Sequence, residues 1–212
     1  MRRLRALRNA APLLAGVLAA TPAQAHLMNS GFGPFYDGLA HPLISPEDLL
    51  PALAMTLLAG LGGARAGRWV LATLPSAWLA GMAAEAGAAA GAGVVAGWAI
   101  GLPAAPTWLT AVVTVLLGAL VASDLRISFT LVIAVAAALG ALHGYDNGQE
   151  LAATSGALLA IAGIACSLFA FVSLLAGQVA VLKAQWARLA VRISGSWIAA
   201  IGLLMLGWSV RG

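Results

Sequence analysis

Histidines and carboxylates gather in two short segments of this sequence, at 38–50 and 142–150. Six of these side chains are candidates to bind one ligand together: His41, Glu47, Asp48, His143, Asp146 and Glu150. Imidazole nitrogen suits nickel, copper, zinc and cobalt, while carboxylate oxygen also suits harder cations. The residue types therefore indicate a divalent metal site without selecting the metal.

The first segment also has a structural explanation. Ser45 is a typical N-cap residue, Pro46 suits the first position of a helix, and the two acids that follow would offset the helix dipole. These roles do not account for His41, which precedes the cap. Because a proline disfavours the helical conformation in the residue before it, Pro42 is expected to hold His41 extended.

The second segment has the spacing of one helix face. His143, Asp146 and Asn147 are three and four positions apart, so they share a face while the helix lasts. Gly148 could end that helix as a C-cap, and Glu150 could lie in the first turn of the next helix. His143, about one turn inside the helix, has no such structural explanation.

The composition predicts the medium around these segments. Only 8% of the 212 residues are charged and 62% are hydrophobic, whereas about a quarter of a soluble domain is charged. The chain is therefore expected in lipid, where apolar runs must be helical because every backbone polar group needs an internal partner. We predict an all-α fold, a polytopic membrane helical bundle. The basic residues form no patch that would bind nucleic acid.

The bundle is expected to follow a cleaved signal peptide. Residues 1–25 combine an arginine-rich start, an apolar stretch and an Ala23-x-Ala25 cleavage pattern, although an uncleaved first helix is an alternative. Residues 26–46 would then be an outer segment and 47–212 a domain of six transmembrane helices. The six apolar runs lie near 47–64, 69–88, 107–123, 127–145, 151–176 and 193–210. The region 86–106 could be an outer loop or re-entrant.

Two further patterns suit helices in a membrane. Gly140, Gly144 and Gly148 give the fourth run a stripe of small residues for close helix contact. The tryptophans fall mostly near the ends of the runs, as expected of anchors at the membrane interface. Both patterns agree with a helical bundle, and neither indicates a cofactor.

The basic residues orient the six helices. The loops after the first, third and fifth runs contain Arg65, Arg68, Arg126, Lys183, Arg188 and Arg192. Because cytoplasmic loops are rich in Lys and Arg, we expect both mature ends on the outer side of the membrane. All three histidines and six of the seven acids then fall on the outer side, and only Asp124 lies clearly inside.

The two segments resemble motifs of the HupE/UreJ family, bacterial membrane proteins implicated in nickel or cobalt uptake for hydrogenase and urease maturation. That family has a cleaved signal, a histidine soon after it and six helices. Its first motif is His-Pro-x-x-Gly-x-Asp-His, and a later one is close to His-Gly-x-Ala-His-Gly-x-Glu. The corresponding segments here are HPLISPED at 41–48 and HGYDNGQE at 143–150, and the resemblance spans nearly the whole chain.

Two histidines of the family motifs are replaced in this sequence. Glu47 takes the place of the aspartate in the first motif, and Asp48 takes that of the second histidine. In the later motif, Asp146 and Asn147 stand where the family has a small residue and a histidine. A carboxylate and an amide in place of two imidazoles make the site harder, which weakens a preference for nickel or copper.

The resemblance implies a permease-like protein rather than an enzyme. It would bind a divalent metal, nickel or cobalt by resemblance, at an outward-facing site and let it cross the inner membrane. The sequence contains no Walker-type phosphate loop, so this chain alone is not expected to use ATP. His26, the first mature residue, and Asp37 are candidates for a recruiting shell. The expected partners are lipid, the metal ion as substrate, a second copy of the chain and an unidentified metallochaperone; no organic cofactor is expected.

Two alternatives from other classes stay open. The three histidines with a carboxylate could hold zinc in an intramembrane hydrolase, with Glu47 or Glu150 as the base. A metal-binding or assembly protein without transport would need only the outer site. The hydrolase requires His26 to lie near the other two histidines.

Overall fold

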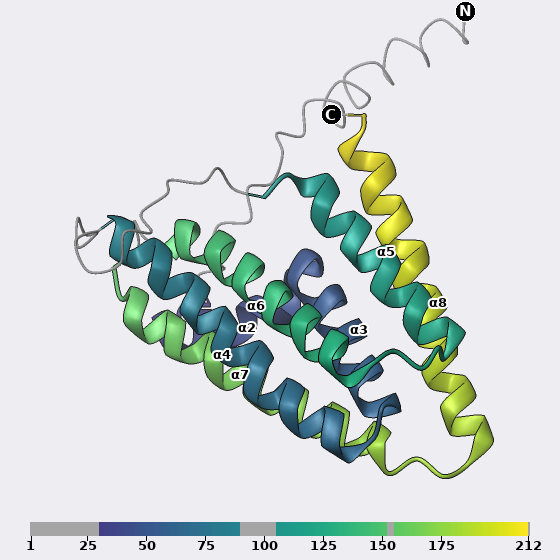
Figure 1. The fold of residues 1–212 in the computed structure, drawn as a ribbon. Helices are drawn as coiled ribbons and strands as arrows, with labels where there is room; N and C mark the ends of the chain where they lie inside the picture. The colour runs from purple at the N-terminus through teal and green to yellow at the C-terminus, as the bar shows by residue number, and fades with distance from the viewer. Residues whose placement is uncertain (1–29, 90–104, 152–154, 212) are drawn as a thin grey trace, which may run out of the picture.

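The computed structural model describes residues 30–89, 105–151 and 155–211, and within these ranges the chain forms seven helices and no strand (Figure 1). The helices are α2 (Pro34–Ile44), α3 (Pro46–Leu61), α4 (Ala64–Ala89), α5 (Thr107–Ser123), α6 (Phe129–Leu151), α7 (Ala157–Ala180) and α8 (Gln185–Ser209). The predicted all-α class is confirmed. The predicted signal peptide at 1–25, His26 and most of the region 86–106 lie outside the described residues.

Helix α3 lies at the centre of the bundle. It contacts each of the other six described helices, and all but one of its residues from Leu50 to Gly60 are buried. The remaining helices pair around it, α4 with α6, α5 with α8 and α2 with α7 (Figure 1). A side chain on α3 is therefore close to several helices that are distant in the sequence.

Several helices are suited to cross a membrane. Among the described helices, α6, α7 and α8 are long and apolar enough, and α2 with α3 passes the same test as one bent span, which makes up to four. Large apolar side chains such as Leu158, Trp197 and Leu204 are exposed on the outside of α7 and α8, as expected for contact with lipid. Each of the six predicted runs overlaps one helix from α3 to α8. The count of six spans stays a prediction.

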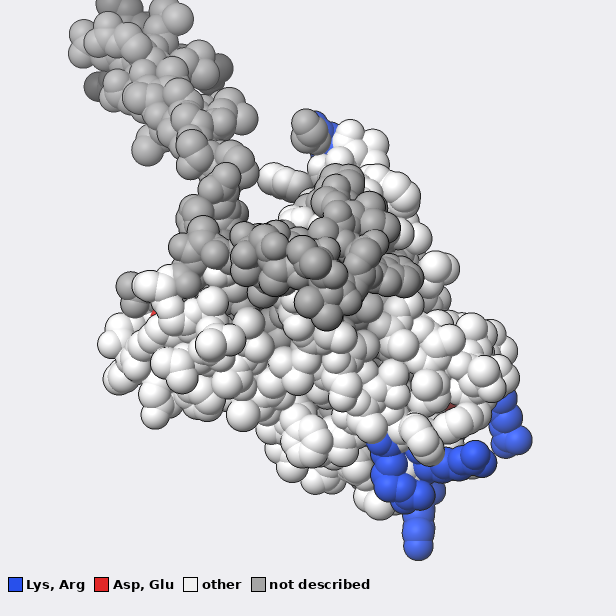
Figure 2. All heavy atoms as spheres, turned by 60° about the vertical axis from the view of Figure 1, so that its left-hand side comes forward, with Lys and Arg blue, Asp and Glu red and all other residues white. Residues whose placement is uncertain are grey.

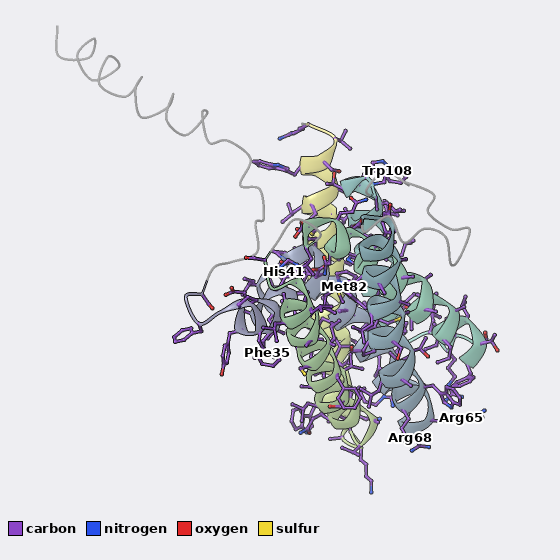
Figure 3. All side chains as sticks on the ribbon, turned by 90° about the vertical axis from the view of Figure 1, so that its left-hand side faces the viewer. Phe35, His41, Arg65, Arg68, Met82 and Trp108 are labelled. Carbon is purple, nitrogen blue, oxygen red and sulfur yellow. The ribbon has the colours of Figure 1, made fainter. Side chains whose placement is uncertain are left out.

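Basic side chains gather at one end of the bundle (Figure 2). Here α3 joins α4, α5 joins α6 and α7 joins α8. These connections and the helix starts after them carry Arg65, Arg68, Arg126, Lys183, Arg188 and Arg192. Figure 3 shows Arg65 and Arg68 at this end and His41 toward the other. His41 and the basic loops thus lie toward opposite ends of the bundle, and the orientation of these ends in the membrane stays a prediction.

A sharp bend separates α2 from α3, whose directions differ by 67°. Pro46 begins α3, and Ser45 before it is extended, with φ −86° and ψ 107°. A residue that precedes proline favours this conformation, and proline suits the first position of a helix. The predicted start of a helix at these two residues is confirmed.

The expectation that Pro42 holds His41 extended is wrong. Helix α2 runs through Pro42 and places His41 in its last turn, so part of the expected outer segment at 26–46 is helical. Gly38 of α2 and Gly163 of α7 let the two backbones come so close that a Cβ on either would collide with the other helix. This packing outweighs the local preference of the residue before proline.

Helix α6 also continues further than predicted. Gly148 does not end it, since the helix runs to Leu151, and Glu150 lies in its last turn rather than at the start of α7. Gly148 is buried inside the helix. As a result, His143, Asn147 and Glu150 stand on one helix at intervals of four and three, which keeps them on one face.

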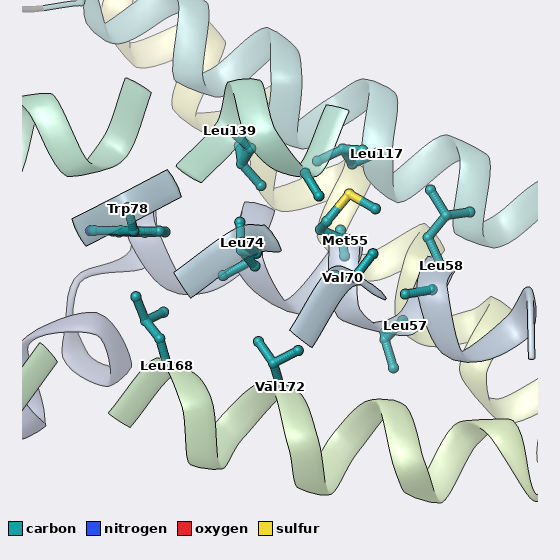
Figure 4. Packing of buried hydrophobic residues seen from close by; sticks show 14 of the residues in the cluster. Met55, Leu57, Leu58, Val70, Leu74, Trp78, Leu117, Leu139, Leu168 and Val172 are labelled. Atoms are coloured by element: carbon teal, nitrogen blue, oxygen red, sulfur yellow. The ribbon is translucent and has the colours of Figure 1, made fainter. Parts of the chain in front are cut away.

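The apolar core surrounds α3 and α4 (Figure 4). Met55, Val70, Leu74 and Trp78 are completely buried in it, and Leu117 of α5 packs beside them. Trp78 therefore departs from the expectation that the tryptophans are interfacial anchors. Its indole ring is part of the interior.

Glycines allow α4 and α6 to pack closely. A Cβ on Gly144 would collide with the backbone carbonyl of Trp78, and one on Gly140 would lie too close to the carbonyl of Leu74. Gly81 of α4 faces the backbone of α6 in the same way. The predicted role of the small-residue stripe is confirmed for Gly140 and Gly144, and it fixes the position of α6 beside the core.

Candidate metal-binding site

Asp48 joins the two polar segments of the sequence in the interior of the bundle. Its Oδ1 lies 2.9 Å from Nδ1 of His143, which is 95 positions away in the sequence. Its Oδ2 lies 3.3 Å from Nε2 of His41 and accepts a hydrogen bond of 3.1 Å from the amide of Asn147. One carboxylate thus contacts three side chains from α2 and α6.

The elements explain why these groups meet. Asp48 lies in the first turn of α3, and the bend at Ser45 turns α2 back so that His41 reaches the same carboxylate. His143 and Asn147 face it together because they are one helical turn apart on α6. The shared face predicted for the second segment is confirmed for these two residues. We call His41, Asp48, His143 and Asn147 the buried cluster.

The cluster is almost completely shielded. Asp48 is 3% exposed, His143 2% and His41 5%. A buried charge is costly unless it is paired and hydrogen-bonded, and here each oxygen of Asp48 has a polar neighbour. The arrangement therefore supplies polar partners to both oxygens of a carboxylate inside an apolar bundle.

The hydrogen bond to Asp48 also sets the tautomer of a neutral His143 ring. An ionised carboxylate can only accept, so Nδ1 of a neutral His143 donates and Nε2 carries the lone pair. This Nε2 atom is buried and has no hydrogen-bond partner. The ring stacks on Trp78, with centroids 5.2 Å apart and planes 27° from parallel. A metal-ligating histidine is held in the same way, with one nitrogen bonded to a carboxylate and the other directed at the metal.

Three further predicted acids, Glu47, Asp146 and Glu150, line a cavity beside the buried cluster. The cavity has a volume of about 690 Å³ and extends to α5 and α8, with Thr110, Met205 and Trp208 in its wall. Its polar lining includes Glu47, Asp48, His143, Asp146, Asn147 and Glu150. Five of the eight predicted site residues therefore meet in one place, and His41 joins them through Asp48.

Two of these acids make further described contacts. Glu150 is 42% exposed at its side chain, and its Oε2 lies 4.0 Å from Nε2 of His41. Asp146 accepts a hydrogen bond of 3.0 Å from the backbone amide of Ala105, which precedes α5. The acids thus form a partly open, anionic shell around the shielded cluster.

The other two predicted residues do not join the site. Asp37 lies in the first turn of α2 and accepts a hydrogen bond of 2.6 Å from the backbone amide of Ser30, a local role at the start of that helix. His26 is outside the described residues, so its proposed ligation and the hydrolase that requires it stay predictions. Glu47 faces the cavity without a described hydrogen bond.

Three residues contribute to the site beyond the predicted set. Asn147 shares the predicted face of His143 and donates to Asp48. Trp78 stacks on the ring of His143, and Thr110 lines the cavity. Of the three, only Asn147 can be predicted from the sequence, by its spacing from His143. The contacts of Trp78 and Thr110 depend on how the helices pack.

The side chains that could ligate a metal contact one another in the described part of the chain and do not surround a common point. Within 30–89, 105–151 and 155–211, no three His, Cys, Asp or Glu side chains converge in a geometry ready to hold a metal. Both oxygens of Asp48 are turned toward imidazole rings. Binding of an ion would therefore require these side chains to exchange their contacts with each other for contacts with the ion.

Comparison with known proteins gives one finding. The family model described as HupE / UreJ protein matches residues 14–205. No curated protein and no solved structure matches the chain. The family is associated with nickel or cobalt transport and with urease or hydrogenase maturation. Since the match includes both polar segments and nearly all of the helical bundle, this chain belongs to the HupE/UreJ family.

Proposed function

We propose that this protein captures a divalent transition-metal cation at the buried cluster and lets it cross the bacterial inner membrane without ATP. The observation that carries the proposal is the carboxylate of Asp48 between His41 and His143, with Nε2 of His143 buried and free of a partner. A structural role alone would not require a second histidine nitrogen that is left unsatisfied. Nickel and cobalt are the metals that the family association favours.

The cavity acids would attract the ion before it reaches the cluster. Glu47, Asp146 and Glu150 line a space that leads to Asp48, and carboxylates raise the local concentration of cations. The ion would then bind Nε2 of His143 while Asp48 keeps its hydrogen bond to Nδ1 of the same ring, and His41 would turn from Asp48 toward the ion. Because amide and carboxylate replace two imidazoles of the family motifs, we expect weaker selectivity for nickel over cobalt and manganese.

The proposed orientation follows from the basic end of the bundle. Basic side chains of a membrane protein are concentrated on the cytoplasmic side, so the cavity would open to the periplasm. The mature N-terminus would lie on the same side as the cavity. A second copy of the chain and a cytoplasmic metallochaperone are compatible partners in this arrangement.

The test is the metal content of cells that express the full chain. Wild type, His41→Ala, His143→Ala and Asp37→Asn are compared at equal membrane levels, with Ni, Co, Zn, Cu, Mn and Fe measured by mass spectrometry. We expect one metal to rise with wild type and with Asp37→Asn, whose carboxylate lies outside the cavity, and not with either histidine variant. No rise with wild type would contradict transport and leave a binding or assembly role. A rise that both histidine variants retain would contradict the site.

A further inference from the structure

A groove lies between α4 and α7 at the basic end of the bundle, where α4 begins and α7 ends. It has a volume of about 200 Å³. Helix α4 contributes Ala64, Gly67, Arg68 and Leu71, whose spacing places them on one face, and α7 contributes three pairs of residues one turn apart. From Ala64 to Leu71 the helix axis covers about 10 Å. The groove therefore runs from the basic end of the bundle along both helices.

Small residues leave this space open. A Cβ on Gly177 would meet nothing within 4 Å, and one on Gly67 would make an ordinary contact of 3.4 Å with the Cβ of Ala176. The hydroxyl of Ser173 donates to the carbonyl of Ala170 in its own helix at 3.0 Å. The other residues of the wall, apart from the arginine, are apolar. The length of the groove therefore suits a hydrocarbon chain.

Arg68 is the one charged side chain among the described residues that line the groove. It is exposed and makes no hydrogen bond or ion pair within the ranges that the structure describes. Other arginines at this end do have contacts. Arg65 lies over the ring of Phe129, 4.6 Å from its centroid, and Arg188 donates to a carboxylate. The guanidinium of Arg68 is thus available to an anion from outside the protein.

The charges around the groove decide what can fill it. Helix α7 contains no acidic residue, and the one acid of α4, Glu85, lies about 25 Å from Arg68 along the helix axis. A second copy of the chain docked here about a two-fold axis would bring two Arg68 side chains toward each other without a neutralising acid. A dissolved phosphate could bind the arginine but would leave the apolar walls uncovered. A phospholipid supplies both a phosphate and a hydrocarbon chain.

We propose that the groove holds one acyl chain of an anionic phospholipid whose phosphate binds Arg68. Arginine pairs with phosphate through two parallel N–H···O bonds, and basic pockets between transmembrane helices bind anionic lipid heads. The volume equals that of about seven water molecules in the liquid, which is enough for part of one chain. The site is separate from the buried cluster and does not depend on metal transport.

The test is native mass spectrometry of the full chain in detergent, titrated with phosphatidylglycerol or with phosphatidylcholine that carries the same oleoyl chains. We expect wild type to bind the first phosphatidylglycerol about fivefold more tightly, the factor that corresponds to about 1 kcal/mol for one basic residue. Arg68→Gln should remove this preference. Gly177→Leu should weaken the binding of both lipids about tenfold, the effect of displacing two methylene groups from the groove, because the leucine occupies space that is open in wild type.

Each variant has a matched control that should bind lipid like wild type. Arg126→Gln removes a charge from the same end, at a residue outside the groove, and Gly207→Leu adds the same side chain to α8, where a Cβ also meets nothing within 4 Å. If Arg68→Gln keeps the preference, or if Gly177→Leu binds both lipids as Gly207→Leu does, the proposal is wrong. It is also wrong if the wild type is a dimer that Gly177→Leu dissociates with no change in lipid binding, since a second copy then fills the groove.

Discussion

Replacing Asp48 by asparagine is the sharpest test of the buried cluster. The substitution keeps the size of the side chain and removes the charge that His41, His143 and Asn147 share. His143 and Asn147 direct N–H groups at different oxygens of Asp48. An asparagine has one oxygen, so it can accept from one of them only, and its NH₂ group then faces the other donor.

The size of the effect follows from these contacts. A hydrogen bond to a charged group contributes about 1.5–3 kcal/mol, and a buried donor left without a partner costs about 1–3 kcal/mol. Since part of this cost is recovered by rotation of Asn147, we expect the free energy of unfolding to fall by about 2–4 kcal/mol. Loss of a carboxylate behind a ligating imidazole lowers metal affinity about 10–100-fold.

Two measurements on the purified full chain in detergent check these values. Thermal unfolding reports the stability change, and calorimetric titration with Ni²⁺ and with Co²⁺ reports the affinity. Asp37→Asn is the matched control, because it makes the same substitution where the described contact of the carboxylate is the amide of Ser30. We expect this control to bind both metals like wild type and to lose about 1 kcal/mol of stability.

The proposed role of Asp48 is wrong if Asp48→Asn unfolds at the wild-type temperature and binds both metals as Asp37→Asn does. That result would mean that the carboxylate neither holds the two histidines nor supports the ion. A variant that is destabilised but binds metal normally would refute the site while leaving the packing argument intact. A double variant with His143→Gln should lose less than the sum of the two single losses, because both remove the same hydrogen bond.

Other predictions concern helix packing and buried polar groups. Gly144→Ala should destabilise the protein by about 1–3 kcal/mol in thermal unfolding, since the new Cβ collides with the carbonyl of Trp78; Gly177→Ala, which meets nothing within 4 Å, should be neutral or slightly stabilising. Ser167→Ala should be neutral or stabilising by the same measurement, because its hydroxyl is buried without a hydrogen-bond partner. A clear loss of stability would mean that the hydroxyl does have a hydrogen-bond partner in the folded protein.

Hydropathy predicted most of the helices of this fold. The run predicted at 107–123 coincides with α5, and the others overlap α3, α4, α6, α7 and α8. Helix α8 begins at Gln185, eight positions before the predicted run, because charged residues in its first turns interrupt the apolar pattern. Hydropathy detects the part of a helix that faces lipid or core, and it does not detect amphipathic ends.

Helix α2 and the contacts within the site could not be predicted in this way. Local rules placed His41 in an extended segment, and only the packing of α2 on α7 makes it helical. The pairing of Asp48 with His143 depends on the bend at Ser45 and on the glycines that bring α6 to α4. These are properties of the assembled bundle. The family motifs indicated which residues to compare but contained no information on distances.

The break between α2 and α3 has an electrical consequence for an ion held at Asp48. Helix α3 has 16 residues and is about 24 Å long, less than the ~30 Å of hydrocarbon in a bilayer. From Asp48 to its end at Leu61 the axis covers about 20 Å, so about two thirds of the transmembrane voltage would fall beyond the cluster. At 100 mV a divalent ion gains roughly 3 kcal/mol over that distance. Voltage would therefore accelerate departure from the cluster more than it favours capture.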